Sequence, residues 1–540
     1  METWKYNKYW SLKQYPPRPE QKKIINEIIE AIEMGFKNII VEAGTGTGKS
    51  AIATTIANYI GDSYILTMTK QLQNQYLDDF DYMLAEIKGT SNYNCSRRNT
   101  TCDDCLQTDN NKARHQNCNY KKALEYAKAH QCIITNYDYL FYAGNYAEVF
   151  GQRDLLVLDE SHNLEKKIMH LIGKTLNRQN IFKHYGLDIF YPVTNGSTLK
   201  SVDNVDYWVK LLHELSSRAR SNKRNAVNKK TIELYEKDKR KFDYLIAQLE
   251  DEEARFIIEL PSKKDILKDK QVNGKFEGQL KAEFKPLTIK DYSDQLLHFG
   301  ETRLFMTGTL GNKDKFCQWI GIDPKETYYI FVKSPFPVSN RPIIKAYVGS
   351  MSGRTGHNPN WRNMNAIAKI QDIINKHQHE KGVIHTSSNQ QAWFIKKSLN
   401  SKSVWVAQGP TREDTIRRFE SSHKPIILVG AGLKDGVDFK GDKCRYQIMF
   451  KMPYPSLAGK QVNIRMHYDP SWYAYQTIMP LMQAYGRGIR DTNDHCVMYI
   501  IDSDFDRLLK NDKYLFNEYF LEAIKQPRKP KIKPLKMEGK

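Results

Sequence analysis

The chain has 540 residues and a formal net charge of +20, from 82 Lys and Arg against 62 Asp and Glu. This length suggests about three or four domains, and 40% hydrophobic residues with 11% aromatics exclude an intrinsically disordered chain. No apolar run approaches the roughly 18 residues of a membrane span, and the N-terminus lacks a secretory signal. The expected compartment is therefore the cytoplasm, or the host cytoplasm if the protein is viral. The basic excess favours a polyanionic partner, which is nucleic acid or a membrane surface.

The first part of the chain alternates apolar strands with amphipathic helices. Isoleucines at helical spacing predict an opening helix that Gly35 ends. A buried strand then leads into the glycine-rich segment 43–50. Further strands are predicted within 63–70, 131–140 and 154–161. Strands that alternate with helices predict an α/β fold with a parallel sheet covered on both faces.

The middle of the chain has a different composition. Residues 218–241 hold ten Lys or Arg and three acidic residues, and 235–256 predicts a long charged helix with a solvated face. A strand and turn are expected within 303–310. A second α/β pattern begins after residue 337, and a basic, proline-containing tail, expected to be disordered, ends the chain. The strands predicted for the second pattern lie within 381–388, 424–431, 446–453 and 496–503.

The segment AGTGTGKS, residues 43–50, has the composition of a phosphate-binding loop. Its glycines let backbone N–H groups turn toward phosphate oxygens, Lys49 can reach the β- and γ-phosphates, and the Ser50 hydroxyl can bind Mg²⁺. The strict pattern begins with Gly where this chain has Ala43, and a glycine-rich turn without a ligand is the alternative. The strand–loop–helix context favours a nucleotide site. Its predicted binding residues are Gly44, Thr45, Gly46, Thr47, Gly48, Lys49 and Ser50.

The segment VLDESHNL, residues 157–164, places two carboxylates at the end of a predicted strand. Open α/β sheets bind ligands at this edge. Asp159 would join the Mg²⁺ shell, and Glu160 would orient and polarise the attacking water. His162 could couple the nucleotide state to the second domain. The alternative is a solvated acidic turn.

The segment QAYGRGIRD, residues 483–491, carries two arginines. Arg487 and Arg490 lie three residues apart, so on a helix they would share one face. Guanidinium groups at that spacing could enter a nucleotide site from another domain and stabilise transition-state charge. Two arginines on a helix are more often a solvated face, so this interpretation depends on the other motifs.

Four of the eight cysteines fall within 24 residues, in the spacing C-x6-C-x2-C-x12-C: Cys95, Cys102, Cys105 and Cys118. Four thiolates can bind zinc or a [4Fe–4S] cluster, and a set of reduced structural thiols is a third alternative. Zinc ribbons usually show two C-x2-C pairs, and this segment has one. Cys132 could compete with Cys118 as the fourth ligand, but it lies in an apolar strand. The cysteines predicted to be core residues are Cys132, Cys317, Cys444 and Cys496.

In their order along most of the chain, these motifs resemble those of superfamily-2 helicases, and within them the XPD/DinG-type iron–sulfur DNA helicases. The chain departs from the family with Ser161 in place of Ala, Gly308 in place of Ala or Ser, and Asp435 in place of Glu. The resembling segments are RPEQ (18–21, Q motif), AGTGTGKS (motif I), LTMTKQLQNQ (66–75, motif Ia), KGTSNYNC (88–95, approach to the first cluster cysteine), DESH (159–162, DEAH box), TGTL (307–310, motif III), GVIHTSS (382–388, motif IV), GLKDGVDFKGD (432–442, motif V) and QAYGRGIR (motif VI).

The resemblance implies two RecA-like P-loop domains, with an iron–sulfur insert and a mainly helical arch-like insert in the first. It adds four residues to the predicted nucleotide site: Arg18 and Gln21, which would contact the adenine, and Gly436 and Asp438 of motif V. It also assigns the four clustered cysteines to a [4Fe–4S] cluster. The implied regions are a first RecA-like domain (1–88, 130–172 and 286–335), a cluster insert (89–129), an arch-like insert (173–285), a second RecA-like domain (336–524) and a basic tail (525–540).

The implied function is ATP- and Mg²⁺-dependent translocation along single-stranded DNA with 5′→3′ polarity, which unwinds forked DNA. The protein is expected to be a monomer without a membrane partner. DNA repair and DNA replication are the processes that such an activity fits. Tyrosines of the cluster insert (Tyr93, Tyr120 and Tyr126) could stack on bases, although buried packing is the more common role. The alternatives are a translocase that remodels complexes without unwinding, an RNA helicase and a nucleotide-gated binding protein. The expected catalytic residues are Glu160, Lys49, Arg487, Arg490 and Gln483.

Overall fold

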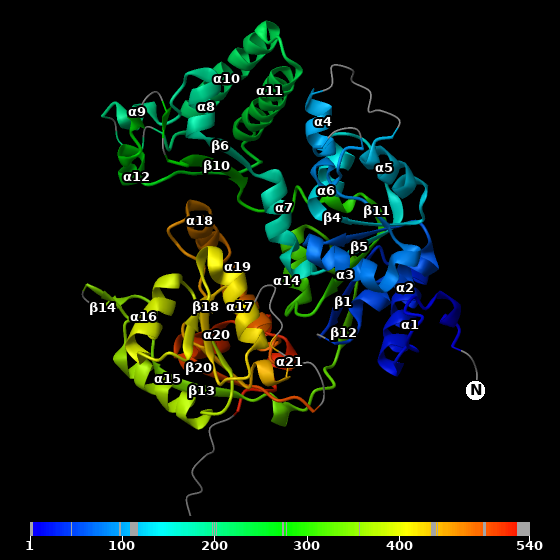
Figure 1. Cartoon of the computed structure of the whole chain (residues 1–540), viewed down its shortest axis with the longest axis vertical. Coiled ribbons are helices and arrows are strands. Elements are labelled where there is room, and N and C mark those ends of the chain that lie inside the picture. Colours follow the sequence, from blue (N-terminus) through cyan, green and yellow to red (C-terminus); the bar gives the residue numbers. More distant parts are fainter. Residues whose placement is uncertain are drawn as a thin grey trace, which may run out of the picture. The chain divides into compact units, whose positions relative to one another are not determined.

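The computed structural model describes the chain except residues 1–3, 45, 97–98, 109–116, 197, 199, 201, 273–274, 277, 356, 434–438, 440, 490–492 and 526–540 (Figure 1). The chain divides into two compact units. The first unit comprises Met1–Ala43, Thr47–Val332 and Ser456–Asp469, and the second comprises Gly44–Gly46, Lys333–Pro455 and Pro470–Lys540. None of the helices in the described part of the chain combines the length and apolar character that crossing a bilayer requires.

The first unit is built on a seven-stranded parallel sheet in the order β12-β1-β11-β5-β2-β4-β3. Alternate residues of its strands enter two separate core clusters, one on each face, as a doubly covered sheet requires. Ile40 and Phe305, for example, face one cluster, and Val41 and Leu304 face the other. The strands are β1 (Asn38–Ala43), β2 (Ser63–Thr67), β3 (Ala85–Glu86), β4 (Cys132–Asn136), β5 (Arg153–Leu158), β11 (Gly300–Thr307) and β12 (Thr327–Val332).

Helices cover both faces of this sheet. The face with Val41 is covered by α1 (Pro19–Glu33), α2 (Lys49–Ile60) and α3 (Lys70–Phe80). The predicted opening helix is thus confirmed, and Gly35 follows it with a positive φ of 86°. The helices of the opposite face are α5 (Asn119–Ala129), α6 (Tyr137–Asn145), α7 (Leu164–Ile172), α13 (Asp294–Leu297) and α14 (Lys313–Ile320).

The region expected as a mainly helical arch also contains a three-stranded antiparallel sheet, β6-β10-β7. Its two long helices, α10 (Val205–Asn225) and α11 (Lys229–Glu250), pack along each other and begin at the capping side chains of Asn204 and Asn228. The charged helix predicted within 235–256 is therefore confirmed as the main part of α11. The remaining elements are β6 (Lys174–Asn177), α8 (Arg178–Tyr185), α9 (Tyr191–Thr194), β7 (Phe256–Glu259), α12 (Lys263–Lys268), β8 (Gln271–Val272), β9 (Lys275–Phe276) and β10 (Lys281–Pro286).

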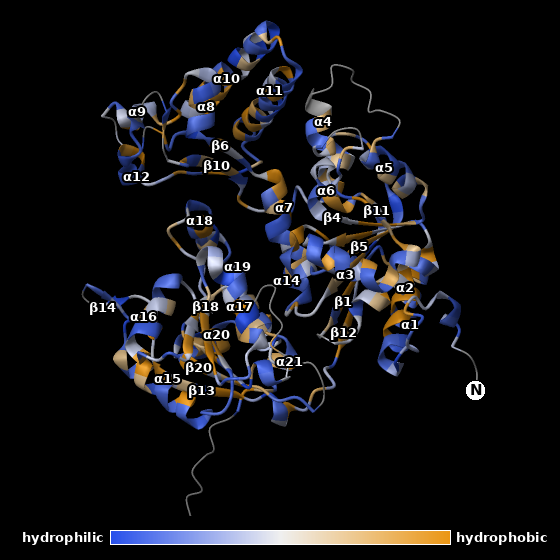
Figure 2. Cartoon of the chain, viewed as in Figure 1, coloured by the Kyte–Doolittle hydropathy of each residue, from blue (hydrophilic) through white to orange (hydrophobic). Residues whose placement is uncertain are grey.

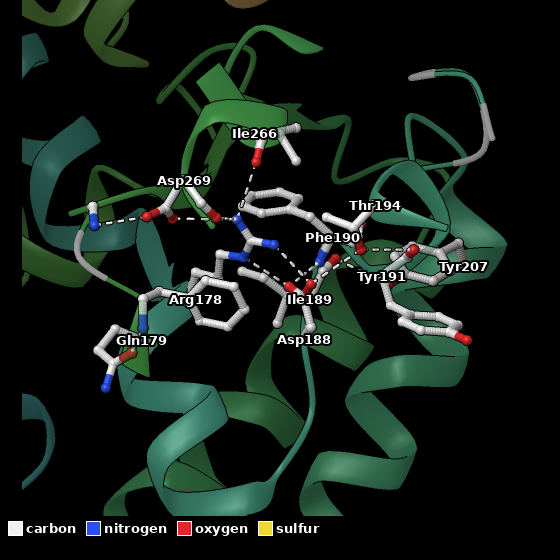
Figure 3. Close-up of polar contacts among 12 residues, drawn as sticks. Arg178, Gln179, Asp188, Ile189, Phe190, Tyr191, Thr194, Tyr207, Ile266 and Asp269 are labelled. Atoms are coloured by element: carbon white, nitrogen blue, oxygen red, sulfur yellow. Dashed lines mark hydrogen bonds and ion pairs between the residues drawn. The ribbon is translucent and has the colours of Figure 1, made fainter. Parts of the chain in front are cut away.

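A buried arginine holds three segments of the arch together (Figure 3). Arg178, at the start of α8, forms a forked pair with Asp188 through Nε (2.8 Å) and Nη2 (2.7 Å). Its Nη1 donates to the carbonyl oxygens of Asp269 (2.9 Å) and Ile266 (3.3 Å), and the guanidinium lies 3.8 Å from the Phe276 ring centroid. Because each nitrogen of the buried guanidinium has a hydrogen-bond partner and two carboxylates balance its charge, Arg178 fixes the path of the chain around α12.

The second unit has a six-stranded parallel sheet in the order β13-β20-β19-β16-β18-β17. The four strands predicted there are confirmed as β16 (Gly382–Thr386), β18 (Ile427–Ala431), β19 (Tyr446–Met449) and β20 (Val497–Asp502). Figure 2 shows hydrophobic residues concentrated along the central strands. The other elements are β13 (Ile343–Gly349), β14 (Arg354–Thr355), β15 (Asn358–Pro359), α15 (Met364–Lys376), α16 (Asn389–Leu399), β17 (Val404–Val406), α17 (Arg412–Ser421), α19 (Pro470–Tyr485), α20 (Asp504–Asn511) and α21 (Glu518–Leu521).

One segment from the stretch expected to form the second RecA-like domain groups with the first unit. Ser456–Asp469 contains the helix α18 (Lys460–Tyr468), whose partners are residues of the first unit. The sequence on both sides of this segment belongs to the second unit.

Candidate active site

The phosphate-loop candidate follows β1 directly and ends where α2 begins at Lys49. Gly46 and Gly48 have positive φ angles of 82° and 78°, a conformation that favours glycine. The Lys49 ammonium donates to the carbonyl oxygen of Ala43 at 3.1 Å and so closes the loop on itself. The loop thus has the backbone that its sequence predicted. Thr45 lies outside the described residues.

The Q-motif residues lie directly against this loop. Gln21 on α1 donates from Nε2 to the carbonyl oxygen of Thr47 at 3.0 Å, and its Oε1 accepts the backbone N–H of Arg18 at 2.9 Å. A Cβ at Gly48 would lie 2.3 Å from Gln21 Nε2 and displace that amide, so glycine at this position, which its φ of 78° also favours, leaves room for the Gln21 side chain. The predicted residues Arg18, Gln21 and Lys49 are therefore brought together around one loop.

Asp159 is buried at the carboxyl end of β5, next to the loop. Its Oδ1 accepts the backbone N–H of Glu160 at 2.9 Å, and its Oδ2 accepts the hydroxyl of Tyr76 at 3.0 Å. Burial and then the charge of Glu160 raise the pKa of Asp159 to about 6, while the Lys49 ammonium opposes the shift. A bound cation would favour the ionised carboxylate. Ser50 also lies beside the Tyr76 hydroxyl, so two oxygen donors suited to Mg²⁺ adjoin one tyrosine.

The residues after Asp159 form a tight polar turn. Glu160 has a left-handed backbone with φ of 52°, an unusual conformation for a residue with a side chain. Its Oε2 lies 3.3 Å from Nδ1 of His162, which in turn lies 3.0 Å from Oγ1 of Thr307 at the end of β11. The Glu160 side chain is about one third exposed (36%), so water can reach its carboxylate. The turn therefore joins the DESH and TGTL segments in one network.

Two tyrosines of the site are absent from the sequence prediction. Tyr76 on α3 bonds the Asp159 carboxylate, and Tyr137 at the start of α6 donates its hydroxyl to the Asp159 carbonyl oxygen at 2.8 Å. Burial, followed by the charge of Asp159, raises the pKa of both tyrosines, so they act as neutral hydrogen-bond donors. Their only sequence signal is that each follows a strand of the sheet that carries the loop.

The motif VI prediction changes in one respect. The helix α19 ends at Tyr485, and Arg487 lies in the following turn, where its backbone N–H bonds the carbonyl oxygen of Ala484 at 3.2 Å. Arg487 therefore lies outside the helix that the prediction of a shared helical face assumed. Gln483 occupies the last turn of α19. Arg490, Gly436 and Asp438 lie outside the described residues, as does Asp435.

The four clustered cysteines all have buried side chains. Cys102 begins α4 (Cys102–Thr108), and its Sγ lies 3.9 Å from that of Cys118. Burial, to which the neighbouring Cys118 and Cys95 add, raises the pKa of the Cys102 thiol. Across the described residues, no group of three or more His, Cys, Asp or Glu side chains is arranged to hold a metal ion. The donor chemistry of four thiols in one segment nevertheless suits a thiolate-bound metal site.

The remaining predictions concern the four scattered cysteines and three tyrosines of the cluster insert. Cys132, Cys317, Cys444 and Cys496 are buried, as expected of core residues. Tyr93 packs edge-on against Tyr120, with ring centroids 5.6 Å apart, and the Tyr120 hydroxyl shares a 2.7 Å hydrogen bond with the Tyr139 hydroxyl. Tyr93 and Tyr120 therefore both have packing contacts within the protein. Tyr126 is exposed.

A cavity of about 470 Å³ lies near the carboxyl ends of β2 and β4. Its lining includes Lys70, Asn92, Asn136 and Tyr142. Tyr142 on α6 is 45% exposed and stacks on the exposed Tyr146, with ring centroids 5.8 Å apart and planes at 29°. The Lys70 ammonium donates to Asn92 at 2.6 Å. The cavity therefore combines a cation, amide groups and an exposed aromatic surface with the carboxylate of Asp138, which pairs with Lys167.

Two family models match this chain: "Type III restriction enzyme, res subunit" over residues 14–187 and "Helicase C-terminal domain" over residues 370–520. The chain is 21% identical to the ATP-dependent DNA helicase YoaA of Haemophilus influenzae, covering 95% of this chain and 94% of that protein. It is 22% identical to YoaA of Escherichia coli K12, covering 91% of this chain and 92% of the relative.

Solved structures of XPD proteins share the fold. One XPD helicase superposes with a TM-score of 0.59 at 17% identity, covering 92% of this chain and 98% of the other. The S. tokodaii Xpd4 structure also gives 0.59, at 14% identity, with 94% and 99% covered. At these identities the likeness establishes the architecture, and the α/β class with two RecA-like parallel sheets is confirmed. The nucleotide-loop geometry, the match to the helicase C-terminal model and the nearly full-length similarity to two ATP-dependent DNA helicases identify the chain as an ATP-dependent helicase, and its fold resembles that of the XPD/DinG type.

Proposed function

We propose that this helicase moves 5′→3′ along single-stranded DNA as a monomer and unwinds forked DNA. The observation that carries the ATP-driven part of the proposal is the convergence of Lys49, Asp159 and Glu160 beyond the carboxyl ends of β1 and β5, the two parallel strands on either side of β11. The names of the two YoaA relatives specify DNA as the nucleic acid, and the +20 charge favours a polyanion. The direct test is unwinding of a forked duplex, because a remodelling translocase hydrolyses ATP without separating strands.

The geometry of the first unit supports specific roles in ATP hydrolysis. Lys49, whose ammonium donates to the loop carbonyl of Ala43, would also reach the phosphate oxygens of a bound nucleotide. Ser50 and Asp159 would hold Mg²⁺, which neutralises charge on the phosphates. Glu160 would orient the attacking water, and its neighbour His162 would report the state of the site through Thr307.

The second group of site residues comes from the order of the motifs. Arg487 and Arg490 would stabilise negative charge on the transferred phosphoryl group, since guanidinium groups suit that role. Gln483 and the motif V residues Gly436 and Asp438 would bind the same nucleotide. The family match over 370–520 includes all of these positions.

We assign a [4Fe–4S] cluster to Cys95, Cys102, Cys105 and Cys118. The support is a donor set made only of buried thiols, the 3.9 Å approach of two of them, and their position between β3 and β4 of the first sheet. A bound cluster would supply a rigid cross-link. Cys102 and Cys118 belong to the hydrophobic core cluster that supports the sheet, so such a cross-link would brace the insert against the motor domain.

The cavity beside Tyr142 is suited to a single strand. Bases stack on aromatic rings without sequence preference, and a motor that passes every sequence needs contacts of this kind. The exposed Tyr142–Tyr146 stack offers such a surface, and Lys70 would face the backbone phosphates.

Tyr142→Ala is expected to weaken single-stranded DNA binding by about fivefold or more, because one base–aromatic stack is worth about 1–3 kcal/mol. Fluorescence anisotropy with a labelled oligonucleotide at fixed salt measures this change. Tyr191→Ala is the matched control, since Tyr191 is exposed at the start of α9 in the arch, remote in sequence from the cavity. Equal affinities of the two variants would remove the cavity from the DNA path.

A further inference from the structure

The segment Ser456–Asp469, called the arm below, leaves the second unit in sequence and belongs to the first in structure. Its helix α18 is fixed at its N-terminus by Glu259 of β7. The Glu259 carboxylate accepts the backbone N–H groups of Lys460 at 3.0 Å and Gln461 at 2.9 Å. These donors have no partner within the helix, and a negative charge is favourable there. Gln461 also donates its amide to the carbonyl oxygen of Pro286 at 2.9 Å.

The centre of the arm is held by a buried ion pair. The Arg465 side chain is 1% exposed and pairs with Glu165, whose side chain is 11% exposed. Arg465 Nη1 also donates to the carbonyl oxygen of Leu287 at 3.4 Å. Removing either charge would leave the other buried without its counter-ion, which is far more costly than losing a surface pair.

The end of the arm has a separate anchor. The Asp469 carboxylate accepts the indole N–H of Trp319 at 2.7 Å. Trp319 is a buried residue of α14, and α14 packs against α7, which carries Glu165. The arm therefore binds two neighbouring helices of the first unit.

Both of these helices follow catalytic segments closely. Glu165 lies in the first turn of α7, three residues after His162 of the DESH turn. The helix α14 begins three residues after the TGTL segment ends at Leu310, and Thr307 of that segment bonds His162. A shift of the arm would thus displace the start of α7 and, through α14, the TGTL turn.

The other end of the connection leads to motif VI. The helix α19 starts at Pro470, immediately after the Trp319-bound Asp469, and ends at Tyr485, two residues before Arg487. One continuous stretch of chain therefore joins the Arg465 and Asp469 anchors to the turn that carries Arg487.

We propose that the arm couples motif VI to the catalytic carboxylates, with Arg465, Glu165 and Trp319 as positioning residues. This inference rests on the proposed function, because it assigns Glu160 and Arg487 to the same reaction. The Arg465–Glu165 pair holds the start of α7 at the placement that Glu160 needs, and the Trp319–Asp469 bond holds α14 and the TGTL turn in register with it. Small misplacements of a catalytic group lower kcat more than they lower nucleotide affinity.

The test compares Glu165→Gln and Trp319→Phe in the full chain. Glu165→Gln keeps the side-chain size and removes one charge, whereas Trp319→Phe removes the indole N–H donor together with part of the buried ring. DNA-stimulated kcat of Glu165→Gln is expected to fall about tenfold, and that of Trp319→Phe by a smaller factor, while KM for ATP changes by no more than about twofold. The number of base pairs unwound per ATP should fall as well. Rates are measured well below each variant's unfolding midpoint.

Asp203→Asn is the matched control, because it removes the acidic partner of Lys460 in an exposed ion pair, and Lys460 lies on α18 as Arg465 does. It should retain the wild-type kcat and the wild-type number of base pairs per ATP, since surface pairs contribute little. If the wild type is active and kcat is unchanged in both Glu165→Gln and Trp319→Phe, the coupling role of the arm is overturned and the proposed function is not. A wild type without DNA-stimulated ATP hydrolysis would instead overturn the proposed function and the coupling with it.

Discussion

Glu160→Gln is expected to lower DNA-stimulated ATP hydrolysis by about 10²–10⁴-fold while ATP still binds. The carboxylate is partly exposed beside the buried Asp159 and lies 3.3 Å from His162, so it can accept a hydrogen bond from the attacking water. The amide keeps the shape but cannot polarise water in the same way. Steady-state hydrolysis and nucleotide binding, measured on the same preparation, separate the chemical defect from a binding defect.

Lys49→Ala should cause a loss of similar size through a different step. It removes the ammonium that bonds Ala43 and would bind the β- and γ-phosphates, so nucleotide binding should weaken as well. Glu148→Gln is the matched control for Glu160→Gln, because Glu148 is also a glutamate with a left-handed backbone (φ of 51°) but is exposed. Near-wild-type hydrolysis by both Glu160→Gln and Lys49→Ala would refute the assigned site.

The second large effect is expected from Cys102→Ser. Cys102 is buried in the insert, and its Sγ lies 3.9 Å from that of Cys118, so the substitution would remove one of the four proposed cluster ligands. The wild type should be brown when freshly purified, with iron and acid-labile sulfide at a ratio of about one to one. The variant should lose the colour and the iron and should lose unwinding, while it retains basal ATP hydrolysis, because no residue of the nucleotide site lies in the insert.

Cys317→Ala tests whether such losses are specific. Cys317 is equally buried but lies on α14, outside the insert, so this variant should stay brown. A colourless wild type that holds one zinc ion per chain would contradict the cluster and favour a tetrahedral zinc site.

The sequence was most informative where structure depends on local pattern. The strands β1, β5, β16 and β18 are short apolar runs because both faces of each sheet are covered, and such runs are visible without a structure. The phosphate loop and the DESH turn were equally predictable, since glycine spacing and a strand end define them. The hydrogen bonds of Lys49 and Gln21 agree with those assignments.

Features that depend on distant contacts were not predictable. Tyr76 reaches Asp159 across 83 positions of sequence, and Arg465 pairs with Glu165 across 300, so no local spacing indicates either contact. The arm reads as part of the second domain because its neighbours in sequence belong there. The helical prediction for Arg487 is wrong for a local reason, since α19 ends at Tyr485 and Gly486, a residue type that favours the end of a helix, follows directly.

The most direct test of the account is unwinding of two DNA duplexes that differ only in their single-stranded tail, one 5′ and one 3′, by the full chain with ATP and Mg²⁺. We predict that the wild type separates the 5′-tailed duplex and leaves the 3′-tailed duplex intact, and that Glu160→Gln separates neither. DNA-stimulated ATP hydrolysis without strand separation would contradict the helicase proposal and indicate a remodelling translocase. Unwinding from the 3′ tail alone would contradict the polarity, and stimulation by RNA but not DNA would contradict the substrate.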